Sequence, residues 1–215
     1  MLEIRFWNAF TKLTGWPVQF FCFRTKILYE DRNVQGRRIK GPAILISNHT
    51  SVFDYAVYLF VFFSRTLRFQ MAELLFKKPF LGWLLRRLGG IQVDRPGYDF
   101  GFMQQSLSVL EKGGIVGVFP ESRLPLPGEE RPLPFKISAA YLALMSGAPI
   151  IPVATNGSYF RKERARVIIG KPIDASDLLE DGVGETENLR IVSERLRERI
   201  KELEKALHEP EKAAR

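Results

Sequence analysis

One of the two histidines of this chain stands near an aspartate, at a spacing that suits acid–base chemistry. His49 comes shortly after the apolar run 43–46, and Asp54 lies five positions further along. A histidine at the end of a buried strand and an aspartate in the first turn of the next helix can meet at hydrogen-bonding distance. The carboxylate would then fix the imidazole tautomer and stabilise the protonated ring. The spacing predicts that His49 is a general base and that Asp54 orients it.

A plainer interpretation of this pair stays open. His49 and Asp54 can form a satisfied structural pair, with Asp54 favouring the start of the helix that it opens. Other candidates are poor, because His208 lies in a charged C-terminal stretch and Cys22, the only cysteine, lies among aromatic residues. One cysteine cannot form an internal disulfide, and the sequence has no Cys/His cluster with zinc spacing. We therefore expect a reducing compartment and no metal site.

Short apolar runs that favour β-structure alternate with helical stretches along the chain. Runs that are apolar on both faces, such as 115–119, belong in the middle of a largely parallel sheet covered by helices. We therefore predict an α/β fold with a mostly parallel central sheet flanked by helices. The expected helices lie near 52–63, 74–88, 99–112 and 135–146, and the expected strands are 43–47, 67–72, 90–93, 114–119, 150–154 and 166–169.

Polar residues follow three of these predicted strands. His49, the pair Asp94-Arg95 and the segment 121–123 each come just after a strand. Ligands of parallel sheets gather at the carboxyl ends of the strands. The three segments are therefore expected to converge on one crevice.

The first 23 residues are rich in tryptophan and phenylalanine, but charges and the break at Gly15-Trp16-Pro17 divide them. A secretory signal would have a continuous apolar core, and a spanning helix would need about 20 mostly apolar residues. Two short amphipathic helices are expected instead, which either lie at a lipid–water interface or pack on the core. The run 55–63 is also too short to span, and is expected to be a buried or membrane-facing helix.

The chain is basic, with a formal net charge of +8. Clusters such as 37–40, 86–87 and 161–166 suit an anionic lipid surface, a phosphorylated substrate, an acidic carrier protein or nucleic acid. Charge alone does not choose among these partners. For any single cluster taken alone, a solvated surface is the favoured interpretation.

The stretch 187–208 has apolar residues at spacings of three and four, which is typical of an amphipathic helix. Its apolar stripe is expected to pack on the domain, although a coiled-coil contact with a second chain fits the same pattern. We predict three parts: an N-terminal membrane-associating segment 1–30, an α/β domain 31–185, and a C-terminal amphipathic helix and tail 186–215.

Four sequence blocks between Gly41 and Pro172 occur in an order that resembles one enzyme family, the glycerolipid acyltransferases typified by 1-acylglycerol-3-phosphate acyltransferase. The blocks are Asn48-His49 with Asp54; the glycine pair, apolar strand and Asp94-Arg95 of 89–95; Phe119-Pro120-Glu121-Ser122-Arg123; and the apolar strand with proline of 148–153, with Phe135-Lys136 linking the last two. Any one block is weak, but four in order are a specific signal. The resemblance implies that 31–185 is an acyltransferase domain.

The third block departs from the family pattern Phe-Pro-Glu-Gly-Thr-Arg-Ser. Ser122 alone joins Glu121 to Arg123, so one residue of the usual Gly-Thr pair is missing. A proline-rich loop, 124–134, follows. In the family this block helps to hold the phosphate of the acceptor, a task for which an arginine fork is apt.

Several residues are therefore expected to contact substrate. The resemblance implies this role for Glu121, Ser122 and Arg123, assisted by Arg95 or Lys136. The alternative is that Glu121 and Arg123 form an ion pair that ties down the loop.

The resemblance also implies a mechanism without a covalent intermediate. His49 takes the proton of the acceptor hydroxyl while that oxygen attacks the thioester carbonyl, and Asp54 steadies the imidazolium. No cofactor is expected, only an acyl-coenzyme A or acyl carrier protein thioester as co-substrate. A covalent route through Ser51 or Ser122 is less favoured, because neither lies in a Gly-x-Ser-x-Gly elbow.

The expected function is that of a membrane-bound O-acyltransferase of phospholipid biosynthesis, peripheral or monotopic on the cytoplasmic face of the cell membrane. The first expected acceptor is the lysophospholipid 1-acylglycerol 3-phosphate, which gives phosphatidic acid; another lyso-lipid or a glycolipid is the alternative. A non-catalytic basic module that binds membrane or nucleic acid would explain the charge but not His49 and Asp54. The sequence has no nucleic-acid-binding motif, so no nucleic acid partner is expected.

Overall fold

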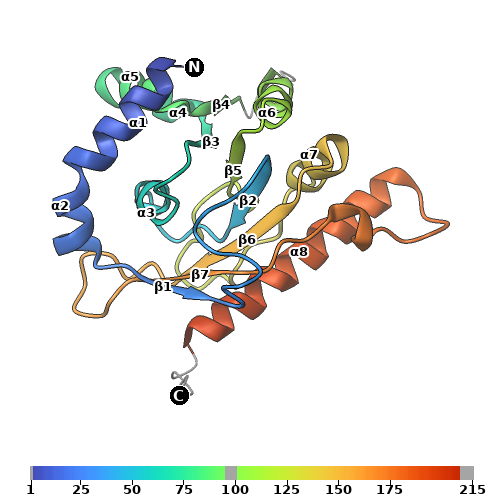
Figure 1. Cartoon of the computed structure of the whole chain (residues 1–215). Coiled ribbons are helices and arrows are strands. Elements are labelled where there is room, and N and C mark those ends of the chain that lie inside the picture. The colour runs from blue at the N-terminus through green and yellow to red at the C-terminus, as the bar shows by residue number, and fades with distance from the viewer. Residues whose placement is uncertain (1, 95–100, 209–215) are drawn as a thin grey trace.

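A computed structural model of the protein describes residues 2–94 and 101–208. The strands in this part of the chain are β1 (Lys26–Tyr29), β2 (Ala43–Ser47), β3 (Leu67–Ala72), β4 (Ile91–Val93), β5 (Ile115–Val118), β6 (Ile150–Thr155) and β7 (Arg166–Ile169). They form one sheet in the order β1-β7-β6-β2-β5-β3-β4 (Figure 1). Paired strands are parallel except β6 and β7, which are antiparallel. The predicted α/β fold with a mostly parallel sheet is confirmed.

The sheet differs from the prediction mainly at one edge. β2, β3 and β7 have the predicted bounds, and the other predicted strands agree to within one residue at each end. β1 is not predicted. It is a half-buried edge strand beside β7, only four residues long, and so lacks the fully buried apolar run that marks a central strand. β1 lies within the predicted segment 1–30, and the predicted division into three parts remains a prediction.

Helices cover both faces of the sheet, and the first helices of the chain lie along one side of the molecule (Figure 1). They are α1 (Leu2–Thr14), α2 (Trp16–Val18), a π-helical turn η1 (Gln19–Phe23), α3 (Asp54–Val61), α4 (Glu73–Phe76), α5 (Pro79–Leu88), α6 (Gly101–Glu111), α7 (Ser138–Ser146), a 3₁₀ turn η2 (Ala175–Leu178) and α8 (Glu185–His208).

The single helix predicted for 74–88 is wrong, because the chain breaks there into α4 and α5. Pro79 occupies the first turn of α5, and Lys78 before it has the extended backbone of φ −76° and ψ 121°. A residue that precedes proline is disfavoured in the helical region, so the break follows from the sequence.

The core has two layers, one on each face of the sheet. Ile44 and Ile46 of β2 pack with α6, α7 and α8, whereas Ala43 and Leu45 pack with α3 on the other face. This is the alternation that a strand buried on both faces requires. The expected buried helix is therefore α3. The apolar stripe of α8 packs on the sheet as expected, and its buried residues are Leu189, Val192, Leu196, Ile200, Leu203 and Leu207.

The N-terminal helix α1 buries polar residues and exposes an apolar face, the reverse of an ordinary surface helix. Its buried residues are polar: Asn8 donates to the Leu88 carbonyl at 3.0 Å, and Lys12 donates to the carbonyls of Phe63 (3.0 Å) and Arg65 (2.7 Å). Its apolar stripe faces outward instead, with Leu2, Phe6, Phe10 and Leu13 all exposed. Within residues 2–94 and 101–208, none of the helices combines the length and the apolar character needed to cross a membrane.

Candidate active site

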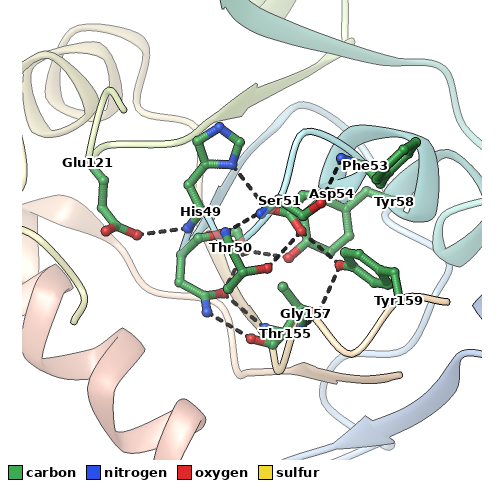
Figure 2. A network of polar contacts seen from close by, with 12 residues as sticks. His49, Thr50, Ser51, Phe53, Asp54, Tyr58, Glu121, Thr155, Gly157 and Tyr159 are labelled. Carbon is green, nitrogen blue, oxygen red and sulfur yellow. Dashed lines mark hydrogen bonds and ion pairs between the residues drawn. The ribbon is translucent and has the colours of Figure 1, made fainter. Parts of the chain in front are cut away.

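The predicted pair lies at the carboxyl end of β2, between the sheet and α3. The strand ends at Ser47, His49 lies in the connecting loop, and Asp54 opens α3. His49 Nδ1 is 3.0 Å from Asp54 Oδ2 (Figure 2). With Nδ1–H donating to the carboxylate, Nε2 is the nitrogen that can take a proton. The His49 side chain is 20% exposed, so it can meet a substrate, whereas Asp54 is fully buried.

Asp54 organises the loop that carries His49. Its Oδ2 accepts the backbone N–H groups of Thr50 (2.7 Å) and Ser51 (2.9 Å), and its Oδ1 accepts the hydroxyls of Thr50 (2.9 Å) and Tyr159 (2.8 Å). These donors offset the cost of burying a carboxylate. Asp54 therefore both opens the helix, as the plainer interpretation requires, and fixes the imidazole.

Two aromatic residues frame the pair. The His49 ring stacks on Phe119, with 4.2 Å between centroids and 17° between planes. Tyr159 packs behind Asp54, where burial and then the Asp54 charge raise the pKa of its phenol above the ordinary value. Tyr159 thus stays neutral and donates to Asp54 at any working pH.

Tyr159 is a site residue that sequence reasoning missed. It lies 105 positions from Asp54, beyond the fourth block. The sequence feature that could have indicated this region is Gly157, in the turn after β6. Gly157 has a φ of +63°, and a Cβ there would come within 2.5 Å of the Thr50 hydroxyl oxygen. Only glycine allows this close approach of two site loops.

Glu121 reaches the same loop from the end of β5. Its Oε1 accepts the His49 backbone N–H at 2.7 Å, and its Oε2 accepts the Leu133 N–H at 2.8 Å. Burial raises the pKa of Glu121, and these two N–H donors partly oppose the rise. The structure thus brings the first and third blocks together, with Glu121 holding the backbone of His49.

The other predicted substrate-binding residues lie around this contact. Arg123 pairs with Glu129 through two bonds of 2.7 Å, so the alternative ion pair with Glu121 is not what the loop forms. Arg123 lowers the pKa of Glu129 to about 2. Ser122 has a φ of +64°, the region that glycine favours, at the place where the family pattern has glycine.

Lys136 is exposed, and its N–H donates to the Pro120 carbonyl at 2.9 Å, which ties its segment to the third block. Arg95 lies outside the described residues. Ser51, considered as a nucleophile, accepts a bond from the Phe53 N–H at 3.2 Å through its hydroxyl. In the described part of the chain no group of His, Cys, Asp and Glu residues could hold a metal ion.

Asn48 links the loop of His49 to β6 and to the C-terminal helix α8. Its amide exchanges bonds with the Thr155 backbone (2.8 and 2.9 Å) and donates to Glu204 Oε1 of α8 at 2.6 Å. Burial raises the pKa of Glu204 to about 7, nearby Glu121 adds to the rise, and the Asn48 bond opposes it. No sequence pattern pointed to Glu204, because it is one glutamate among many on an amphipathic helix.

We expect Glu204→Gln to stabilise the protein above neutral pH. The folded pKa of about 7 lies above the ordinary 4.5. The contribution of this carboxyl is therefore most favourable below about pH 4.5, and is lost as pH rises to about 7. At pH 8 the glutamine variant should melt about 2–4 °C higher than wild type, the size that a discounted cost of about 1 kcal/mol gives.

The measurement is thermal unfolding of both proteins at pH 5 and pH 8. The exposed Glu187→Gln change on the same helix is the matched control. Equal differences between variant and wild type at the two pH values would show that Glu204 does not carry this cost.

Comparisons with known proteins match this chain to a family of enzymes. The family model described as Acyltransferase matches residues 26–156. The 1-acyl-sn-glycerol-3-phosphate acyltransferase of Bacillus subtilis is 29% identical over 146 residues, covering 66% of this chain and 70% of that protein. The human 1-acyl-sn-glycerol-3-phosphate acyltransferase beta is 30% identical over 145 residues, 66% of this chain but 51% of that protein. The Limnanthes alba enzyme is 33% identical over 140 residues, 62% and 49% respectively.

A solved structure shares the fold. The crystal structure of the 1-acyl-sn-glycerophosphate acyltransferase of Thermotoga maritima superposes with a TM-score of 0.67, covering 97% of this chain and 81% of that one, at 22% identity. At this identity the likeness concerns the fold alone.

Proposed function

The chain belongs to the acyltransferase family, and we propose that it moves a fatty acyl group from an acyl thioester to the free hydroxyl of 1-acylglycerol 3-phosphate, giving phosphatidic acid. The observation that carries this proposal is the His49–Asp54 contact of 3.0 Å at the carboxyl edge of the sheet, with Nε2 left to face a substrate. The names of the relatives support the choice of acceptor.

The proposed reaction is a direct transfer. His49 Nε2 takes the proton of the acceptor hydroxyl as its oxygen forms a bond to the thioester carbonyl carbon. The carbon–sulfur bond then breaks, and the thiolate of coenzyme A or acyl carrier protein leaves and takes up a proton. Asp54 holds the ring and stabilises its positive charge between these steps. Because a thiolate is a good leaving group, the reaction needs no second acid.

The acceptor's phosphate is proposed to bind at the third block. Arg123 presents a planar fork there, and in the free protein the partly exposed Glu129 carboxylate occupies that fork. Solvent reaches both side chains and screens this ion pair, so a phosphate dianion can replace Glu129. The same pairing supports the second candidate, an acceptor without phosphate, since Glu129 already neutralises Arg123.

An acceptor panel tests the proposal. Purified protein is given acyl-coenzyme A or acyl carrier protein donors with 1-acylglycerol 3-phosphate, other lysophospholipids and a glycolipid. We expect product with the phosphate monoester, and we expect Arg123→Gln to raise the KM for that acceptor about tenfold or more while leaving kcat nearly unchanged. The exposed Arg190→Gln change is the control. Product with a different acceptor, unaffected by Arg123→Gln, would transfer the chemistry to the second candidate.

We also propose that the protein lies on the cytoplasmic face of the membrane, held by its N-terminal helices. The exposed stripe of α1 continues into Trp16, Phe20 and Phe21, and all three are exposed. Phe80 and Trp83 of α5, which packs beside α1, extend the same surface. An outward aromatic stripe next to basic residues suits the lipid–water interface.

Two substitutions test this attachment without removing the residues that dock α1. Phe6→Ser/Phe10→Ser should weaken binding to anionic vesicles about tenfold or more, because two rings no longer leave water. Co-sedimentation with liposomes measures this. Met145→Ser/Leu179→Ser removes exposed apolar residues on α7 and after η2 and should leave binding unchanged. Equal loss in both double variants would show that α1 is not the attachment surface.

A further inference from the structure

A cleft of about 1000 Å³ lies at the amino ends of β3 and β5, whereas His49 lies at the carboxyl end of β2. Thr66 and Gly113–Ile115, which precede or begin β3 and β5, line it. β2 and β5 run parallel, and His49 follows the far end of β2. Residues of α1 and α6 form the walls. The cleft is therefore separate from the catalytic pair.

The charged residues that line this cleft are all basic. Arg5, Lys12, Arg65, Arg68 and Lys112 line it, and none of its described lining residues is acidic. The nearest acidic residue on α1, Glu3, is paired with Arg87 outside the cleft. Concave surfaces lined by charges of one sign concentrate the field and attract ions of the opposite sign.

Among residues 2–94 and 101–208, two of these cations have no carboxylate partner: Lys12, which is buried, and Arg68, which is partly buried. Burial lowers the pKa of Lys12 to about 8 and also lowers the pKa of Arg68. Lys12 donates to two carbonyls, and Arg68 Nε donates to the Gly89 carbonyl at 2.9 Å. Neutral carbonyls satisfy their hydrogens but do not balance their charge. An anion in the cleft would provide that balance.

The surroundings indicate what kind of anion fits. Ile4, Leu13 and Phe63 give the same cleft an apolar part. Leu13 also belongs to the exposed apolar stripe of α1, so the cleft adjoins the surface proposed to face lipid. A ligand that matches both parts carries a phosphate group next to a short apolar or glycerol portion.

We infer that this cleft is a binding site for a phosphate-bearing anion, in which Arg5, Arg68 and Lys112 contact the phosphate above the buried Lys12. The inference does not rest on acyl transfer, since no residue of the cleft belongs to the catalytic pair or its hydrogen-bond network. Lipid headgroups and free phosphate esters share this chemistry, and they are separated by experiment.

Lysine NMR provides a readout confined to the cleft. In full-length protein labelled with ¹³C at lysine Cε, the Lys12 resonance is assigned by its loss in Lys12→Arg. Its pH titration is then followed with inorganic phosphate, sn-glycerol 3-phosphate, dihexanoyl phosphatidate or dihexanoyl phosphatidylcholine. Phosphate binding should move the Lys12 titration to higher pH, because a nearby anion favours the charged ammonium. The zwitterionic lipid should have little effect.

Paired variants make the result specific. Arg5→Gln/Lys112→Gln removes two exposed cations of the cleft and should weaken phosphatidate binding, read at Lys12, by about tenfold or more. Arg190→Gln/Lys205→Gln removes two exposed cations of α8 and should not. Tighter binding of phosphatidate than of the soluble phosphates would assign a lipid headgroup, and equal binding would assign a free phosphate. No movement of the Lys12 titration with any of them, or equal affinity in both double variants, would overturn the inference.

Discussion

His49→Ala is expected to reduce the rate of acyl transfer by about 10³-fold or more, with little change in KM. The general base contributes only in the transition state, so its loss lowers kcat. Among the described residues, the His49 ring contacts Asp54 through a hydrogen bond and stacks on Phe119, so its removal should disturb the fold little. The backbone N–H of residue 49 still donates to Glu121 in the variant.

The measurement is steady-state kinetics with 1-acylglycerol 3-phosphate and an acyl thioester on mixed micelles. His208→Ala, the other histidine, is the matched control and should retain full activity. Circular dichroism and vesicle binding should be the same for all three proteins. An alanine variant within tenfold of wild type would show that His49 is a structural residue.

Asp54→Asn is expected to cost about 10²- to 10⁴-fold in kcat while the protein still folds. The asparagine oxygen can keep the bonds from the Thr50 and Ser51 N–H groups and from His49 Nδ1. Its NH₂ group then faces the hydroxyls of Thr50 and Tyr159, which can rotate to accept. The geometry is preserved and only the charge that stabilises the imidazolium is lost.

Tyr159→Phe is the informative companion to this variant. It removes a donor to Asp54 but keeps the carboxylate, so we expect a loss of less than about tenfold. Both variants are measured by kcat under saturating acceptor, with thermal unfolding as the folding control. If Asp54→Asn is as active as Tyr159→Phe, Asp54 serves the helix start and loop alone.

The sequence was sufficient for the parts of the site that depend on local spacing. A strand, a short loop and a helix start place His49 and Asp54 together whatever the rest of the fold does. The order of parallel strands then brings Glu121 beside them, because β5 pairs with β2. Even so, the role of Glu121 as an acceptor for the His49 backbone depends on a distance that spacing does not give.

The residues that escaped prediction are held by contacts distant in sequence. Tyr159 and Glu204 reach the site across 105 and 156 positions, and neither stands in a pattern that marks it. The partner of Arg123 could not be predicted either, because two acidic residues, Glu129 and Glu130, follow in the same loop. Only the folded loop, in which the Leu126 N–H also donates to Glu129, selects between them. The break before Pro79, in contrast, follows from a known local rule and was missed.

The most direct test of acyl transfer by His49 is the formation of phosphatidic acid from labelled acyl thioester and 1-acylglycerol 3-phosphate by wild type and His49→Ala, with the lipid product identified by mass spectrometry. We expect labelled phosphatidic acid from wild type, at least about 10³-fold less from the variant, and equal vesicle binding by both. If wild type forms no acylated lipid with any acceptor of the panel, or if the two proteins form equal amounts, His49 is not the base of an acyltransferase.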